Sequence, residues 1–330
     1  MRIAINGFGR IGRIFLRNIL DRAGIEVVAI NDLSDNQTLS HLFKYDSVHR
    51  GFKGVVNTDP NYLYINDHQI RTYSELEPST LPWKELNVDL VIEATGKFTS
   101  KEGACLHLKA GAKQVIISAP STDKSVPTIV IGVNDHLIDL HSPVLSNASC
   151  TTNNVALMVK ILDENWGIID GYITTVHSMT SDQNLHDAPH KDLRRARAAS
   201  ASIIPTTTGA AKAITAIFPH LQGHLGGAGI RVPVLNGSLT DFTCSLKDKP
   251  TIEAINQAFK LAAYGPMKDI LEYTEDPIVS SDILDNTHSC IFDAKLTSIV
   301  GGLVKVVGWY DNEMGYSSRL ADLTVKISQL

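Results

Sequence analysis

The first thirty residues alternate between apolar runs and one amphipathic stretch. Residues 2–6 (RIAIN) are typical of a short buried strand, and residues 10–22 carry apolar side chains at helical spacing. After Gly24, residues 25–31 (IEVVAIN) form a second apolar run. This strand–helix–strand order predicts two parallel strands joined by a right-handed crossover.

The same alternation continues through the first half of the chain. It predicts strands at 88–93 (VDLVIE), 114–118 (QVIIS) and 128–132 (TIVIG), with a helix near 101–110. Strands separated by helices favour an α/β fold with helices on both faces of a parallel sheet. We therefore expect a Rossmann-type, doubly wound parallel-sheet domain over residues 1–149.

Beyond residue 150 longer β-rich runs replace this alternation. The pattern predicts strands at 171–177, 229–246 and 303–309, and helices at 151–165, 209–217, 251–263 and 317–328. We expect an α+β domain with a mainly antiparallel sheet over 150–316. Residues 178–206 lack periodicity, and a loop of that length inside a domain is usually functional.

Composition narrows the class of protein. Hydrophobic residues make up 43% of the 330 positions and charged residues 20%, as in ordinary globular domains. A net charge of −5 gives no electrostatic sign of nucleic-acid or anionic-membrane partners. Four widely spaced cysteines, with no CxxC pair and no signal-peptide pattern, favour reduced thiols and a cytoplasmic location.

The turn after the first strand reads Gly7-Phe8-Gly9-Arg10-Ile11-Gly12, a GxGxxG motif that opens the predicted helix. In a dinucleotide site Gly7 permits the tight turn, Gly9 the approach of backbone to a pyrophosphate, and Gly12 close helix–strand packing. Asp32 follows the second strand, 20 residues past Gly12, where it would accept hydrogen bonds from ribose hydroxyls and repel a 2′-phosphate. The motif therefore favours NAD over NADP.

The stretch SNASCTTNN places a lone thiol, Cys150, at the start of the helix predicted over 151–165. A lone cysteine is commonly a small buried residue, but a helix N-terminus lowers a thiol pKa and activates a nucleophile. His177 ends the strand GYITTVH and could supply the base. Spacing alone does not prove that the two side chains meet.

Two stretches suit anionic groups, which an acidic protein must hold with local donors. The run 206–212 (TTTGAAK) places hydroxyls and Gly209 at a predicted helix start, and Arg231 opens a strand. Arg195 lies in a basic run that could face ligand, solvent or an interface. The histidine pairs at 186/190 and 220/224 lack a HExxH glutamate, so no metal site is predicted.

Taken together, these motifs resemble phosphorylating glyceraldehyde-3-phosphate dehydrogenases over almost the whole chain. The similar segments are INGFGRIGR, SNASCTTN, HKDLRRARAA, IIPTTTGAAKA, RVPV and WYDNEMGYS. The resemblance implies that Cys150 attacks an aldehyde, that His177 acts as its base, and that Asn312 holds the nicotinamide carboxamide. It further implies a homotetramer, in which loop 178–201 walls a neighbour's cofactor site, and a last helix (317–330) that packs back on the first domain.

The family's remaining site residues also have matches here. The implied cofactor contacts are Gly7, Gly9, Arg10, Ile11, Gly12, Asp32, Thr95, Ser118, Asn312 and Tyr316. The implied substrate-phosphate residues are Thr180 and Arg231. The residues implied around inorganic phosphate are Ser149, Thr151, Arg195, Thr208 and Gly209.

Four positions depart from the family pattern. Asn154 replaces a frequent second cysteine, Leu76 a frequent arginine near the adenine, and Met314 a frequent tryptophan. Ala188 replaces a leucine that helps exclude the NADP phosphate, which weakens the preference for NAD.

The resemblance implies oxidation of glyceraldehyde 3-phosphate by NAD, with phosphate releasing 1,3-bisphosphoglycerate from a Cys150 thioester. One alternative is an erythrose-4-phosphate dehydrogenase, in which water attacks the thioester. Another is a non-catalytic NAD-binding regulatory protein. The Thr208-Gly209 site favours attack by phosphate, and the presence of both Cys150 and His177 favours catalysis.

Overall fold

The chain folds into two separately packed units in a computed structural model that describes all residues, Met1–Leu330. Unit 1 comprises Met1–Ile129, His136–Ala148 and Ser317–Leu330. Unit 2 comprises Val130–Asp135 and Ser149–Tyr316. The segment Val130–Asp135 belongs with unit 2 because Gly132 lies against Leu157 and Ile270 there.

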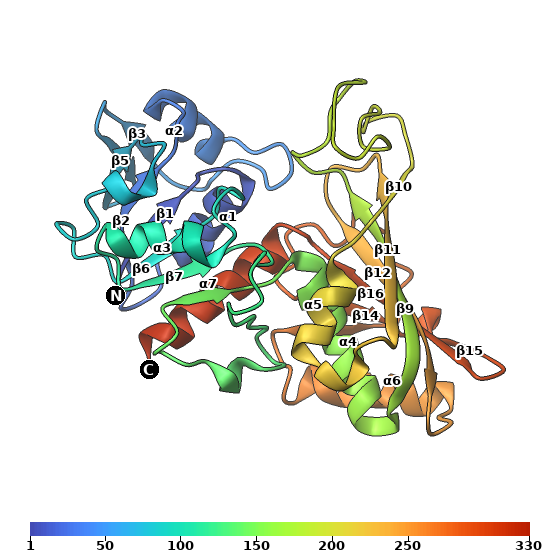
Figure 1. The fold of residues 1–330 in the computed structure, drawn as a ribbon. Helices are drawn as coiled ribbons and strands as arrows, with labels where there is room; N and C mark the ends of the chain where they lie inside the picture. Colours follow the sequence, from blue (N-terminus) through green and yellow to red (C-terminus); the bar gives the residue numbers. More distant parts are fainter. The chain divides into compact units, whose positions relative to one another are not determined.

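Unit 1 is built on an eight-stranded, mostly parallel sheet with the order β3-β4-β5-β2-β1-β6-β7-β8 (Figure 1). Its strands are β1 (Arg2–Asn6), β2 (Glu26–Asn31), β3 (Val56–Thr58), β4 (Tyr62–Ile65), β5 (His68–Tyr73), β6 (Leu90–Glu93), β7 (Gln114–Ile117) and β8 (Val144–Ser146). Only the β3-β4-β5 edge is antiparallel. Every residue of β6 is buried, as expected for a strand covered on both faces.

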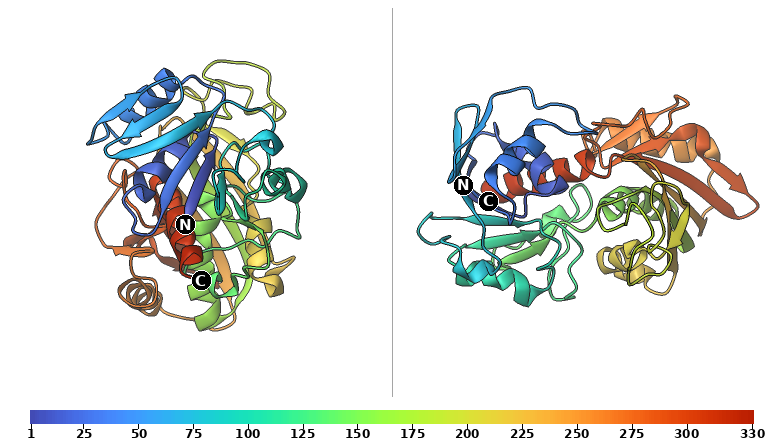
Figure 2. Two further views of the ribbon diagram at one scale, coloured as in Figure 1. Left: turned by 90° about the vertical axis from the view of Figure 1, so that its left-hand side faces the viewer. Right: turned by 90° about the horizontal axis from the view of Figure 1, so that it is seen from above.

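Helices cover both faces of this sheet. They are α1 (Arg10–Ile19), α2 (Asn36–Lys44), α3 (Lys101–Lys109) and the last helix, α7 (Met314–Ser328). The right-hand view of Figure 2 shows α1 beside α7 on one face and α3 on the other. Asn18 of α1 donates a hydrogen bond to Ser318 of α7 at 3.3 Å.

The strand predicted at 128–132 does not form, and this prediction is wrong. Thr128 makes only an isolated bridge to Ser146, and the chain then turns. Asn134 accepts a hydrogen bond from the Val130 N–H, and Asp135 accepts one from the Gly132 N–H, so these donors are diverted from a strand ladder. The eighth strand is instead the short β8.

Unit 2 contains a second eight-stranded sheet, with the order β10-β11-β9-β12-β16-β14-β13 and with β15 paired to β16. Its strands are β9 (Ile168–Ser178), β10 (Ile204–Thr206), β11 (Leu225–Val232), β12 (Ser238–Leu246), β13 (Leu271–Thr274), β14 (Cys290–Asp293), β15 (Ser298–Val300) and β16 (Leu303–Tyr310). The single run predicted at 229–246 is therefore two strands. Five of the seven pairings are antiparallel; β9–β11 and β13–β14 are parallel.

One face of the second sheet is covered by α4 (Cys150–Trp166), α5 (Ala210–Ile217) and α6 (Ile252–Tyr264) (Figure 1). Along β12 buried and half-exposed residues alternate, which is typical of a sheet packed on one face. Residues 179–203 contain no helix or strand and loop out beyond the ends of β9 and β10. Short 3₁₀ turns occur at Pro78–Thr80, Asp135–Leu137, Pro219–Leu221 and Ala294–Leu296.

The two sheets confirm the predicted fold class, a Rossmann-type domain followed by a domain with a mainly antiparallel sheet. None of the helices combines the length and the apolar character that a transmembrane helix needs.

Candidate functional site

The thiol of Cys150 lies in the first turn of α4. Ser149 caps this helix, and its hydroxyl accepts a hydrogen bond from the Thr152 N–H at 3.1 Å. The N–H groups of a first helical turn have no partners within the helix and favour negative charge nearby. The local sequence thus places the sulfur where a thiolate is stabilised.

His177 meets this thiol from the carboxyl end of β9. Its Nε2 lies 3.4 Å from the Cys150 Sγ, which is the contact that sequence spacing left open. The parallel pairing of β9 with β11 sets Arg231 directly opposite His177. The Arg231 guanidinium donates to the Ser178 carbonyl at 2.9 Å and lies 2.7 Å from His177 Nδ1.

The two neighbours of His177 Nδ1 favour opposite tautomers, because the Arg231 guanidinium can only donate and the Ser178 carbonyl can only accept. Nδ1 lies 2.8 Å from the Ser178 carbonyl oxygen, which accepts only from a protonated nitrogen. Nδ1 cannot donate to Ser178 and accept from Arg231 at once. The Nδ1–H tautomer leaves the Nε2 lone pair facing the thiol, which is the arrangement a general base requires.

Burial and charge act together on this pair. Burial raises the pKa of the Cys150 thiol, while the Arg231 charge and hydrogen bonds from Thr151 oppose the rise. Burial, together with the Arg231 charge, lowers the pKa of His177 to about 3. Near neutral pH both shifts favour an uncharged thiol beside an uncharged imidazole. This differs from the lowered thiol pKa expected from the helix terminus, because desolvation of the thiol and the imidazole, which spacing does not reveal, outweighs the charge of Arg231 and the hydrogen bonds at the thiol.

A buried tyrosine supports the thiol and the imidazole from β16. The Tyr310 hydroxyl hydrogen-bonds with the Thr151 hydroxyl at 2.9 Å and the Thr175 hydroxyl at 2.8 Å. Its ring lies edge-on to His177, with centroids 6.0 Å apart. The Thr151 side chain, implied by the resemblance near inorganic phosphate, is therefore engaged by Tyr310 in this structure.

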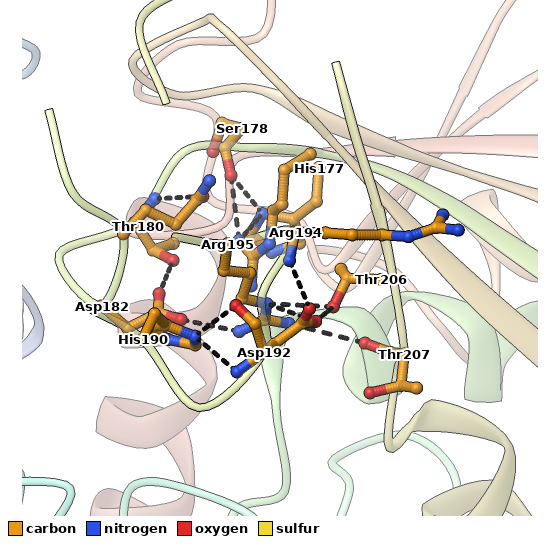
Figure 3. Close-up of polar contacts among 12 residues, drawn as sticks. His177, Ser178, Thr180, Asp182, His190, Asp192, Arg194, Arg195, Thr206 and Thr207 are labelled. Carbon is orange, nitrogen blue, oxygen red and sulfur yellow. Dashed lines mark hydrogen bonds and ion pairs between the residues drawn. The ribbon is translucent and has the colours of Figure 1, made fainter. Parts of the chain in front are cut away.

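Two carboxylates within the loop 179–203, those of Asp182 and Asp192, both pair with Arg195 (Figure 3). Asp182 accepts hydrogen bonds from the Thr180 hydroxyl and, at 2.6 Å, from Arg195. Asp192 accepts from the Thr206 hydroxyl at 2.6 Å, and Arg195 donates to that same hydroxyl at 3.0 Å. Burial raises the pKa of Asp182, but the hydrogen bond from Thr180 and the charges of Arg231 and Arg195 outweigh burial and hold this pKa below its usual value.

The other predicted residues of unit 2 take distinct positions. Thr208 precedes α5 and its hydroxyl accepts from the Ala210 N–H at 3.2 Å. Gly209 is the N-cap, where an added Cβ would contact no protein atom within 4 Å. The Asn312 amide oxygen accepts from the Ser178 and Ser238 hydroxyls at 2.8 and 2.9 Å, so its amide nitrogen is the part directed elsewhere. Tyr316 is buried in the first turn of α7.

A cavity of about 250 Å³ lies in unit 1 at the carboxyl ends of the parallel strands. Its lining residues are Asn6, Gly7, Gly9, Asn31, Asp32, Leu33, Glu75, Leu76, Ala94, Thr95, Lys97 and Phe98. Open α/β sheets bind ligands at this edge. Of the predicted cofactor residues, Gly7, Gly9, Asp32 and Thr95 line the cavity, whereas Arg10, Ile11, Gly12 and Ser118 do not.

The three motif glycines have different surroundings. An added Cβ on Gly7 would lie 2.7 Å from the Thr95 nitrogen, and one on Gly12 would lie 2.2 Å from the Gly7 carbonyl oxygen. At Gly9 an added Cβ would contact no protein atom within 4 Å. Packing therefore requires glycine at 7 and 12, but not at 9.

Asp32 and Arg10 are both held by neighbouring groups. One oxygen of Asp32 accepts from the Phe8 N–H at 2.8 Å and the other from the Ser34 N–H at 3.0 Å. The Arg10 guanidinium pairs with Asp46 at 2.7 Å. Any contact of Arg10 with the cavity would therefore involve its backbone and not its guanidinium.

Three residues of these sites, Tyr310, Asp182 and Glu93, were not predicted from the sequence. Tyr310 directly follows a predicted strand and precedes the segment DNEMG, and Asp182 lies in the loop marked as functional. These positions carried a weak signal. Glu93 ends a predicted strand next to Thr95, which is where a parallel sheet presents its ligand-facing residues.

Comparison with known proteins gives consistent matches to both units. Residues 1–101 match the family model described as glyceraldehyde 3-phosphate dehydrogenase, NAD binding domain, and residues 149–312 match the corresponding C-terminal domain. Glyceraldehyde-3-phosphate dehydrogenase 2 of Streptomyces avermitilis is 52% identical over 328 residues, 98% of either chain. The enzyme named glyceraldehyde-3-phosphate dehydrogenase of Streptomyces coelicolor is 53% identical over 329 residues, 98% of either chain. That of Mycobacterium avium is 51% identical over 336 residues, 100% of this chain and 99% of the relative.

Proposed function

The chain belongs to the glyceraldehyde-3-phosphate dehydrogenase family, and on this premise we propose that it oxidises D-glyceraldehyde 3-phosphate with NAD and inorganic phosphate to 1,3-bisphosphoglycerate, the glycolytic reaction. The observation that carries the proposal is the 3.4 Å contact between the Cys150 Sγ and His177 Nε2 at the start of α4. A thiol and an imidazole so placed form an activated nucleophile for carbonyl chemistry.

The residues of the unit 1 cavity fit NAD. Gly9 leaves space for a ligand at the mouth of the GxGxxG turn, because a Cβ there would meet no protein atom. Asp32 presents a fixed carboxylate at the end of β2, as ribose hydroxyls require. We assign the Asn312 amide nitrogen to the nicotinamide carboxamide, since its oxygen is already bound by two serines. When bound, NAD supplies the acceptor for a hydride.

Cys150 and His177 carry out the first covalent step. The thiol proton moves to His177 Nε2 as the sulfur attacks the aldehyde carbon. A C–S bond forms, the carbonyl π electrons move to oxygen, and the imidazolium returns the proton to that oxygen. Proton transfer creates a thiolate and an imidazolium together, so the attraction between them offsets the cost of burying either charge.

The oxidation and the acyl transfer use the same two side chains. His177 removes the hydroxyl proton of the hemithioacetal as the C–H bond breaks with its electron pair, and the reformed carbonyl is a thioester on Cys150. A phosphate oxygen then attacks the thioester carbon, the C–S bond breaks, and Cys150 leaves as a thiolate. The Arg231 charge beside the thiol stabilises this leaving group.

Thr180, Arg195, Arg231, Thr208 and Gly209 remain the proposed phosphate-binding residues. Thr180 and Arg195 are suited to bind an anion, since both already donate hydrogen bonds to the carboxylate of Asp182. Phosphate must share or replace these contacts. Ser149 and Thr151 would act near phosphate through their positions at the start of α4.

We also propose that the protein is a cytoplasmic homotetramer. Leu185, Leu193 and Ile203 are at least 69% exposed in or next to the 178–201 loop, where the family forms subunit contacts. Light scattering coupled to size exclusion should give about four times the chain mass of 35.9 kDa. A monomer would exclude the tetramer.

Turnover with and without inorganic phosphate tests the proposed reaction. Without phosphate we expect one equivalent of NADH per active thiol in a rapid burst, followed by slow turnover, because the thioester accumulates on Cys150. Thr208→Ala should raise the KM for phosphate roughly tenfold or more, the effect of losing a charge-assisted hydrogen bond of about 1.5–3 kcal/mol. Rapid phosphate-independent turnover with erythrose 4-phosphate would instead establish the hydrolytic alternative.

A further inference from the structure

Behind two residues that line the unit 1 cavity, Asn6 and Thr95, a single carboxylate accepts from four hydrogen-bond donors. Glu93 ends β6 and its side chain is completely buried. One oxygen accepts from the Thr95 N–H at 2.8 Å and from the Thr95 hydroxyl. The other accepts from Asn6 at 2.6 Å and lies 3.1 Å from His107 Nε2.

The Glu93 contact with His107 has a fixed direction. The Trp83 indole N–H donates to His107 Nδ1 at 3.0 Å, so Nδ1 carries no proton in this arrangement. The ring proton is then on Nε2, which donates to Glu93. Trp83, His107 and Glu93 form a buried relay in which each donor faces an acceptor.

A second series of hydrogen bonds leads from Glu93 along the strand ends. Asn6 uses its amide nitrogen for Glu93, and its amide oxygen accepts from Asn31 at 2.7 Å. Asn31 in turn bonds both backbone groups of Glu75, with distances of 2.8 and 2.9 Å. Asn6, Asn31 and Glu75 all line the cavity, so this series fixes part of its lining.

The relay also decides what Thr95 offers a ligand. Its single hydroxyl proton goes to Glu93, and its oxygen accepts from the Lys97 N–H at 3.0 Å. Towards the cavity, the Thr95 hydroxyl can therefore act only as a hydrogen-bond acceptor. This suits a ribose hydroxyl or an adenine amino group, which donate, and not a phosphate oxygen.

We propose that Glu93 is a positioning residue for NAD, which orients Thr95 and Asn6 in the cofactor cavity and links the occupancy of that cavity to Trp83 through His107. This inference rests on the proposed function, because it assigns the cavity to NAD. Partly satisfied buried networks are costly, so a change at Glu93 should propagate to every group that it orients.

Glu93→Gln tests the positioning role with little change in volume. The glutamine nitrogen must face either the two Thr95 donors or Asn6 and His107, and one pair loses its acceptor. We expect the Kd for NAD, measured by calorimetry, and the KM for NAD to rise at least tenfold. At saturating NAD, kcat should stay within about threefold of the wild-type value.

Thr324→Val is the matched control. Thr324 is also fully buried in unit 1 and hydrogen-bonded, to the Leu320 carbonyl at 2.9 Å, but it does not line the cavity. The Kd of the Thr324→Val variant for NAD should remain within twofold of the wild-type value. A Kd within twofold for Glu93→Gln as well would overturn the positioning role. Failure of the wild-type protein to bind NAD would instead overturn the proposed function.

Tryptophan fluorescence tests the link to Trp83. Saturating NAD should change the wild-type emission, and Trp83→Phe should lose at least half of this change while Trp166→Phe keeps it. Glu93→Gln, saturated with NAD, should lose the same part of the change, because the emission of Trp83 responds to NAD through Glu93 and His107 and not through the proximity of NAD alone. Retention of the full change in Trp83→Phe would overturn the link.

If Glu93→Gln does not fold, Trp83→Phe still tests whether the relay orients the cavity. It preserves the carboxylate and its donors but frees Nδ1 of His107 from its donor, so the ring can change tautomer. The Kd for NAD should then rise at least threefold. An unchanged Kd in this variant would overturn the inference that the relay orients the cavity.

Discussion

Gly9 and Gly12 belong to one motif, yet alanine should lower stability at Gly12 and weaken NAD binding at Gly9. A Cβ on Gly12 would lie 2.2 Å from the Gly7 carbonyl oxygen and 3.2 Å from its carbon, so α1 must move away from the turn. Overpacking of this kind costs about 1–3 kcal/mol, and because the obstacle is backbone, Gly12→Ala should cost about 3 kcal/mol. At about 2–4 °C per kcal/mol, the coefficient for a domain of the size of unit 1, the melting temperature of this unit should fall by roughly 6–12 °C.

Gly9→Ala meets no protein atom within 4 Å, and Gly9 has an extended conformation that alanine also adopts. The poorer N-cap should cost only about 0.5 kcal/mol. If backbone N–H groups here bind the pyrophosphate, the methyl group should weaken a charge-assisted hydrogen bond worth about 1.5–3 kcal/mol. The Kd for NAD should then rise roughly 10- to 100-fold.

Scanning calorimetry gives the melting temperatures, and titration calorimetry gives the Kd for NAD. Gly302→Ala is the control, because its Cβ also meets no protein atom and it lies in a turn of unit 2. That variant should change neither quantity. Binding of NAD by Gly9→Ala within twofold of wild type would contradict a ligand role for this backbone, and destabilisation of Gly9→Ala as large as that of Gly12→Ala would contradict the difference in packing.

Three further predictions concern single groups. Limiting iodoacetamide should label Cys150 before Cys244, because Cys150 is partly exposed and Arg231 and Thr151 oppose the rise of its pKa, whereas Cys244 is buried and its pKa is raised to about 12. Equal labelling of Cys150 and Cys244 in peptide maps would exclude Cys150 as the nucleophile. Asp32→Gly should raise the NADP-to-NAD ratio of kcat/KM, and equal use of both cofactors by the wild type would contradict the role of Asp32 as a gate. Burial raises the pKa of Asp46, but hydrogen bonds from backbone N–H groups and from Arg10 outweigh it and bring this pKa to about 2. Asp46→Asn should therefore lower the free energy of unfolding by about 2 kcal/mol at pH 7. Because a lowered carboxyl pKa stabilises the fold only above its unfolded value, this difference should shrink as the pH falls from about 4 towards 2, and a constant difference in urea titrations would refute it.

Local signals explain why much of the fold was predictable. The alternation of strand, glycine turn and helix at residues 2–31 depends on contacts close in sequence, and the structure has β1, α1 and β2 there. The helix predicted from residue 151 begins one residue earlier, at Cys150, where Ser149 supplies a cap that the sequence displays directly. The apolar run at 128–132 misled the prediction, since the side chains of Asn134 and Asp135 take its backbone donors.

Long-range contacts explain what the sequence could not provide. Glu93 and His107 are 14 residues apart, and Tyr310 lies 159 residues from Thr151. No periodicity relates such pairs, which meet only because the order of strands places them together. The pKa of His177 was also unpredictable, because it depends on burial and on Arg231, 54 residues away.

The ladders on both sides of β9 determine where this protein tolerates insertions. Residues 171–178 pair one to one with β11 in parallel, and the other edge of β9 pairs antiparallel with β12. One extra residue in this stretch would turn the His177 side chain to the opposite face of the sheet, while Cys150 on α4 would stay in place. Added residues between 179 and 203 would leave both ladders intact. Relatives and engineered variants should therefore differ in length after Ser178 but keep constant spacing from Gly171 to His177.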